Sequence, residues 1–135
     1  MTAATSDRDT QRREAVTFDY AALGGQIFYA GALIAIDSAT GFAGPCTGAA
    51  TQTVVGVAEV RLSTIGLANG AVTIKVRRGC FRFANDAAPN AYGMADIGSV
   101  AHALDDATIS KAAGALARAG TVCDIDPSGD VWIEI

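Results

Sequence analysis

The chain has 135 residues, a formal net charge of −4 and a hydrophobic fraction of 50%, which indicate one globular domain rather than a disordered chain. The net negative charge argues against a dedicated nucleic-acid-binding protein. Alanine and glycine supply much of the composition and large side chains are few, so the hydrophobic core is expected to be thin. A thin core is most easily stabilised in a small β-barrel or sandwich, or by association with partners.

The N-terminal segment is the least structured part of the sequence. Residues 1–15, MTAATSDRDTQRREA, have no strong amphipathic pattern and few large apolar groups, which predicts an extended arm that is flexible on its own. A passive tail or a short exposed helix is the alternative. The polar start does not resemble a signal peptide, and the longest apolar run, residues 30–36, is too short to span a bilayer. We therefore expect no membrane partner.

From residue 16 onward the pattern becomes that of β-strands. Short apolar or alternating runs predict strands at residues 16–20, 27–29, 33–37 and 54–62. Residues 37–45, DSATGFAGP, are dense in turn formers. Asn69-Gly70 is a strong hairpin signal before the next strand.

The stretch GAVTIKVRRGCFRFAN, residues 70–85, predicts a charged strand that changes phase. Apolar and polar residues alternate up to Arg77, which is the period of a half-buried strand. After Gly79 the apolar residues Phe81 and Phe83 have the opposite parity. A glycine at such a point indicates a β-bulge or a sharp bend that lets both rings enter the core while Arg82 stays outward.

The last third continues the β pattern. Residues 85–90 indicate a loop, residues 99–104 a short strand, and residues 121–126 and 131–135 a terminal hairpin around Pro127-Ser128-Gly129. The alanine-rich residues 106–119 allow a helix, but a strand at residues 108–111 followed by a loop is favoured. The fold class is therefore all-β, a small β-barrel or β-sandwich. The expected organisation is an arm at residues 1–15 and a single β-rich domain at residues 16–135.

The three cysteines do not form a recognisable site. Cys46, Cys80 and Cys123 are far apart and show no zinc-ligand spacing, which favours free thiols and a reducing intracellular origin. We expect Cys80 and Cys123, which fall within predicted strands, to be buried.

Two patterns imitate functional sites. The C-terminal DIDPSGDVWIEI resembles the start of an EF-hand calcium loop, but its twelfth position is Ile135 instead of the required glutamate, so a hairpin turn is the simpler interpretation. His102 is the single histidine, and no local pattern joins it to a serine or cysteine nucleophile. We expect no catalytic residues, no metal and no cofactor, although a small hydrolase built around His102 is a third class of function to test.

One basic cluster stands out in the body of the chain. Lys75, Arg77, Arg78 and Arg82 are either a solvated strand face or a contact surface for an acidic protein. Direct nucleic-acid binding is disfavoured because Phe81 and Phe83 fit a core better than a stacking platform.

Several runs together resemble a known family. AGALIAIDSATGFAGPCTGAATQTVVGVAE is similar to the early part of bacteriophage capsid cement, or head decoration, proteins, in which an Asp-x-x-Thr-Gly-type turn and a V-G-V-A strand recur. VRRGCFRFAN, GSVAHALDDATIS and RAGTVCDIDPSGDVWIEI resemble the C-terminal half of the same family. The likeness covers roughly residues 18–135, and the alanine-rich residues 112–119 depart from the family pattern.

The resemblance implies a non-enzymatic structural protein of the virion. Such proteins are made in the host bacterial cytoplasm and bind the outer surface of the expanded head. They bridge neighbouring major capsid subunits, often as trimers at three-fold or quasi-three-fold positions. The arm would then become ordered on binding. The capsid-interface candidates are Arg8, Arg12, Arg13, Phe18, Lys75, Arg77, Arg78 and Arg82. The alternative function is a small β-barrel module of a virion that binds carbohydrate or a cell-surface ligand.

Overall fold

The computed structural model describes residues 5–7, 9, 11–112 and 114–135. These residues form twelve strands and one short 3-10 helix, so the predicted all-β class is confirmed. The helix, η1, spans Met94–Asp96. The strands are β1 (Thr17–Ala21), β2 (Ile27–Phe28), β3 (Leu33–Asp37), β4 (Ala43–Pro45), β5 (Gln52–Ala58), β6 (Leu62–Ser63), β7 (Thr73–Arg77), β8 (Cys80–Asn85), β9 (Val100–Ala103), β10 (Thr108–Ser110), β11 (Ala117–Ile125) and β12 (Val131–Glu134).

The C-terminal half closes into a small five-stranded barrel, which confirms the predicted architecture. The circuit runs β8–β10–β9–β11–β12, and β12 pairs again with β8. Only the β8–β10 pair is parallel among these five. We call this unit the barrel lobe. Ile109, Val122 and Ile133 are almost completely buried in its core.

A second lobe is built from the N-terminal strands. Its order is β4–β3–β5–β7–β1, and a parallel bridge between Ala22 and Ala43 brings the end of β1 against β4. The short pair β2–β6 forms a separate two-stranded sheet. We call the unit of β1 to β7 the N-terminal lobe. Its own core contains Phe28, Ile34 and Ile74, all completely buried.

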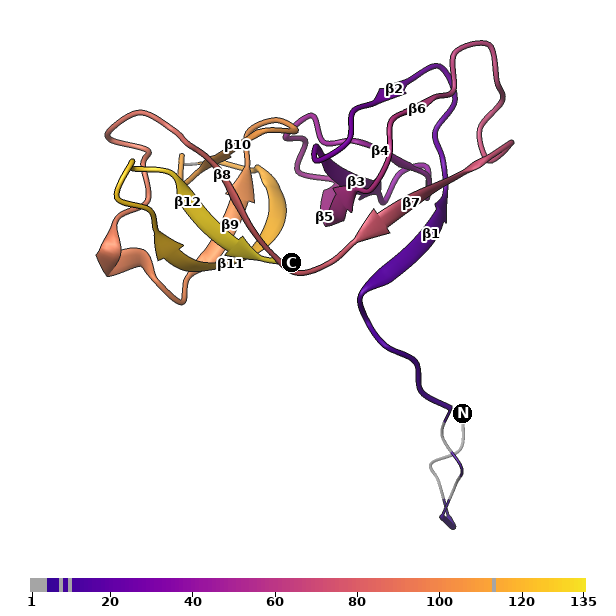
Figure 1. Ribbon diagram of the computed structural model, residues 1–135, viewed down its shortest axis with the longest axis horizontal. Coiled ribbons are helices and arrows are strands. Elements are labelled where there is room, and N and C mark those ends of the chain that lie inside the picture. The colour runs from indigo at the N-terminus through magenta and orange to yellow at the C-terminus, as the bar shows by residue number, and fades with distance from the viewer. Residues whose placement is uncertain (1–4, 8, 10, 113) are drawn as a thin grey trace.

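The two lobes share their central strands. Leu33 and Ala35 of β3 pack into the core that fills the barrel lobe, whereas Ile34, between them, packs into the core of the N-terminal lobe. This alternation follows from the period of two along a strand. β5 also touches β11 through the parallel pair Thr53–Arg118. Figure 1 shows the two lobes side by side, with the end of β12 between them.

The charged stretch is the link between the lobes. Its alternation is confirmed in β7, where Ile74 and Val76 are buried and Lys75 is exposed. At Arg78 and Gly79 the chain leaves the N-terminal lobe, and β8 then joins the barrel lobe. The phase change is therefore a crossover between lobes and not a bulge within one strand.

The crossover explains the reversed parity of β8. Phe81 and Phe83 point inward and pack against the barrel core, as predicted, while Arg82 remains exposed. Cys80 takes an outward position on the same strand and is exposed, and Cys123 is partly exposed, so their predicted burial is wrong. Cys46 is buried, and this burial raises the pKa of its thiol.

The predicted hairpin at Asn69-Gly70 is also wrong. β6 pairs with β2, whereas β7 pairs with β1 and β5. The Asn69 carboxamide oxygen instead accepts a hydrogen bond of 2.9 Å from the backbone N–H of Gly24. The turn signal is therefore real, but the strands on either side of it belong to different sheets.

The alanine-rich segment of residues 106–119 contains the short strand that the sequence favoured, followed by a loop. β10 occupies Thr108–Ser110, and the described residues between it and β11 have no regular structure. β11 begins at Ala117, four residues before the predicted start, and forms the predicted antiparallel hairpin with β12. Within the residues that the structure describes, there is no helix long and apolar enough to cross a membrane.

Candidate functional site

The point where the arm leaves the body is held by one aromatic ring. The guanidinium of Arg13 lies 4.5 Å from the centroid of the Phe18 ring, and that of Arg78 lies 5.9 Å from it. Phe18 also stacks with Tyr20 at 6.0 Å between centroids. A cation–π contact at an exposed site contributes about 0.5–1 kcal/mol. The backbone N–H of Arg78 donates to the carbonyl of Val16 at 2.7 Å, so the arm begins from a defined position.

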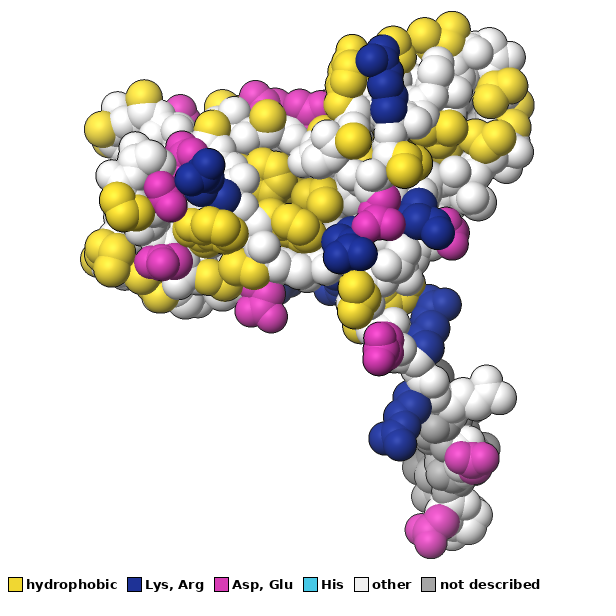
Figure 2. All heavy atoms as spheres, in the orientation of Figure 1, with side chains coloured by type: hydrophobic (Ala, Val, Ile, Leu, Met, Phe, Trp, Pro, Cys, Tyr) yellow, Lys and Arg dark blue, Asp and Glu magenta, His cyan; other side chains and the backbone are white. Residues whose placement is uncertain are grey.

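The outer face of β7 carries charges of both signs. Arg77 forms an ion pair with Glu59, with Nε and Oε1 2.6 Å apart. The register of β1 and β7 places Asp19 opposite Lys75. Figure 2 shows basic and acidic side chains side by side in this part of the surface. The face therefore carries both signs of charge, and Lys75 is an exposed cation on it.

Arg82 is separated from the other members of the basic cluster. It projects from β8 on the barrel lobe, where its guanidinium lies 3.5 Å from Asp126 and 3.7 Å from Asp130. Hydrogen bonds from the Ser128 hydroxyl and N–H lower the pKa of Asp126, and Arg82 adds to this effect. Four cations that are close in sequence are thus divided between two lobes, with Arg77 and Arg82 paired locally. Of the arm candidates, Arg12 is exposed and Arg8 lies outside the described residues.

A cleft of about 500 Å³ opens where the lobes meet. Arg78 from the crossover and Arg118 from β11 line it together with Glu134 of β12. Sequence reasoning missed Arg118 because residues 112–119 were assigned to a loop. The alternation of buried Ala117 and Ala119 around exposed Arg118 is the signal that identifies the strand.

A second cleft, of about 480 Å³, also lies between residues of the two lobes. Tyr29, which is 51% exposed, lines it together with Arg82 and Asp106. The guanidinium of Arg61 lies 5.2 Å from the Tyr29 ring centroid. Burial, with a smaller effect of Asp105, raises the pKa of Asp106. The cleft combines an aromatic surface with both signs of charge.

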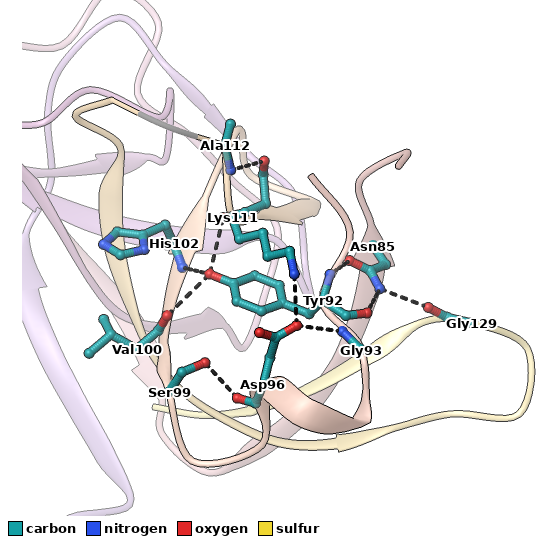
Figure 3. A network of polar contacts seen from close by, with 11 residues as sticks. Asn85, Tyr92, Gly93, Asp96, Ser99, Val100, His102, Lys111, Ala112 and Gly129 are labelled. Atoms are coloured by element: carbon teal, nitrogen blue, oxygen red, sulfur yellow. Dashed lines mark hydrogen bonds and ion pairs between the residues drawn. The ribbon is translucent and has the colours of Figure 1, made fainter. Parts of the chain in front are cut away.

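A polar network fixes the loop between β8 and β9 (Figure 3). The Asn85 side chain donates to the carbonyl of Tyr92 at 2.8 Å and accepts from its N–H at 2.9 Å, as a strand neighbour would. The Tyr92 hydroxyl accepts from the backbone N–H of His102. The hydrogen bond from the N–H of Gly93 lowers the pKa of the Asp96 carboxyl, and the hydrogen bond from Lys111 lowers it further. His102 thus takes part through its backbone, and the network has a structural role.

Some of the exposed apolar side chains lie near the two ends of the molecule. At the end of the N-terminal lobe, Ile65 and Leu67 follow β6 and are 63% and 43% exposed. At the end of the barrel lobe, Met94 of η1 and the nearby Ile97 are 66% and 42% exposed. Figure 1 places β6 and the loop before β9 at opposite ends of the body. We call these residues the N-terminal-lobe patch and the η1 patch.

Comparison with known proteins finds no matching family model, no matching curated protein and no matching solved structure.

The acidic C-terminal turn forms a hairpin, as expected. The Asp126 carboxylate accepts hydrogen bonds from the Ser128 hydroxyl and N–H, and the N–H of Gly129 donates to the Asp126 carbonyl. Over the described ranges, no group of three or more His, Cys, Asp or Glu side chains is placed to hold a metal ion.

Proposed function

We propose that this chain is a structural capsid cement protein that binds the outer surface of a tailed-phage head and bridges neighbouring major capsid subunits. The observation that carries the proposal is the pair of exposed apolar patches at opposite ends of one body. A bridging protein needs two separate contact surfaces, and contiguous exposed apolar patches mark such surfaces. The two cores share β3 and β5, which couples the ends mechanically.

The arm supports the same function. Its described residues are exposed, and Figure 1 shows the segment before β1 leading away from the body. The Arg13–Phe18–Arg78 arrangement sets the position from which it leaves. A segment that orders on a partner reaches surface that the body does not cover. The family resemblance of residues 18–135 points the same way, toward a non-enzymatic protein that associates as a trimer on the virion surface.

The decisive experiment is binding of the purified protein to capsids before and after expansion. We expect strong binding to expanded capsids and little binding to unexpanded ones, measured by co-sedimentation. The double variant Ile65→Ser with Met94→Ser removes one exposed apolar residue from each patch and should weaken binding to expanded capsids. Equal binding to both capsid forms, or unchanged binding of the double variant, would contradict the proposal.

Charge reversal at the outer face of β7 gives a second prediction. Lys75→Glu is expected to weaken capsid attachment severalfold at low ionic strength and much less at high salt, because exposed charges are screened. Arg82→Glu is the matched control. Since Arg82 is already paired with Asp126 and Asp130, its reversal should disturb the local turn more than capsid attachment. Attachment of the Lys75 variant that equals the wild type at every salt concentration would reassign Lys75 to a solvated face.

The second cleft favours one alternative, a ligand-binding module of a virion. An exposed aromatic ring beside charged groups is a common lining for a small polar ligand such as a carbohydrate, and Tyr29 supplies the ring. Tyr29→Ala separates the two functions. The variant should bind capsids normally if the protein is a cement protein, and should lose glycan binding if it is a ligand-binding module.

A further inference from the structure

The cleft between the lobes holds two arginines and one acidic side chain, an excess of positive charge among its lining side chains. Arg78 and Arg118 are both exposed and reach the cleft from different lobes. Among the described residues, neither arginine has a carboxylate within ion-pair distance, whereas Arg77 and Arg82 each do. The third charged side chain of the cleft is Glu134, whose carboxylate lies 4.0 Å from the Cys123 sulfur. The cleft thus offers two guanidinium groups and one carboxylate to a ligand.

The arm of the same chain carries the complementary pattern. In its sequence Asp7-Arg8-Asp9, one base has one acid on each side. The cleft has the opposite composition, with two bases and one acid. Arginine is well suited to such a contact because its guanidinium binds carboxylates through two parallel hydrogen bonds. A cleft of about 500 Å³ lies within the size range of ligand pockets in proteins.

The direction of the arm favours a second copy as its source. Arg13 lies over Phe18, and the described part of the arm leads away from the body (Figure 1). We propose that the Arg78–Arg118 cleft binds the Asp7-Arg8-Asp9 segment from the arm of a second copy of this chain. Each copy then donates one arm and accepts one, which is a heterologous contact that closes into a ring when the rotation allows it. The inference rests on the self-association that the proposed function includes.

Complementation between two variants tests this exchange in solution, without capsids. One variant lacks residues 1–15 and keeps its cleft, and the other carries Arg118→Glu and keeps its arm. We expect neither to self-associate alone, while an equimolar mixture forms a one-to-one pair by light scattering after size exclusion. The unaltered chain should itself self-associate under the same conditions, and a monomeric unaltered chain would show that the arm binds its own cleft and would overturn the exchange. Absence of a pair from a mixture of two folded variants, checked by circular dichroism, would overturn the proposal.

A peptide of residues 1–15 gives the second measurement. We expect it to bind the protein that lacks residues 1–15, and to bind about tenfold or more weakly when that protein also carries Arg118→Glu. Arg61→Glu is the control, because Arg61 is exposed but contacts Tyr29, away from this cleft. A peptide in which both acids are lysine should bind the Arg118→Glu protein better than the native peptide does. Equal affinity of the native peptide for both cleft forms would refute the assignment, whatever the outcome of capsid binding.

Discussion

Replacing Gly120 by alanine is expected to destabilise the protein by about 3–5 kcal/mol, close to the largest effect of a single substitution. Gly120 has a φ of +126°, which L side chains rarely adopt, and a Cβ there would overlap the carbonyl oxygen of Glu134. The residue lies at the irregularity in β11, where its register with β9 shifts. β11 also pairs with β12 and β5, so a displaced backbone at this position disturbs three pairings.

Gly98→Ala is the matched control for backbone conformation alone. Gly98 has a φ of +90°, but open space surrounds the position that a Cβ would take. Its replacement should cost about 1–2 kcal/mol, the penalty of a left-handed conformation. Urea denaturation of both variants separates the cost of the backbone conformation from the cost of the overlap with the Glu134 carbonyl oxygen. Equal losses would mean that the close approach between β11 and β12 does not determine the stability of the barrel lobe.

Leu33→Ala and Ile34→Ala are each expected to cost about 2–5 kcal/mol, because both side chains are completely buried. The two residues are neighbours on β3 but belong to different cores. If the shared strands couple the lobes, each substitution lowers the stability of the whole molecule. Both variants should therefore unfold in a single transition with a lower midpoint.

The fluorescence of Trp132 shows whether the two lobes unfold together. It is the single tryptophan of the sequence, and it lies on β12 in the barrel lobe. Ile34→Ala, in the core of the N-terminal lobe, should nevertheless move the unfolding midpoint that tryptophan fluorescence reports. Ile65→Ala, at an exposed position, should change the midpoint little. A fluorescence transition that Ile34→Ala leaves unchanged would show that the lobes unfold independently, which is a poor property for a bridging protein.

The coupling between the two lobes and the arrangement of the surface arginines both bear on the proposed bridging function. A protein that transmits force between its ends needs one cooperative fold, and the shared strands β3 and β5 supply the continuity. The surface charges are arranged differently, because Arg77 and Arg82 are satisfied locally while Arg78 and Arg118 face the cleft between the lobes. Among the described residues, the cations expected to attract a partner are therefore those that form no local ion pair.

Local patterns in the sequence determined the strands. The alternation in β7, the apolar run of β3 and the turn formers after β11 each predicted an element that the structure contains, because side-chain period and turn chemistry are local properties. The parity change at Gly79 also correctly predicted inward Phe81 and Phe83.

Only the tertiary structure decided which strands pair and which charges meet. Asn69-Gly70 has the chemistry of a hairpin turn, yet β6 and β7 join different partners, because pairing depends on burial across the whole molecule. Cys80 is exposed for the same reason, since the crossover assigns its side of β8 to the outer face. Arg78 and Arg118, 40 positions apart in sequence, line one cleft because two lobes meet there. No local pattern contains that information, since it arises from contacts between residues distant along the chain.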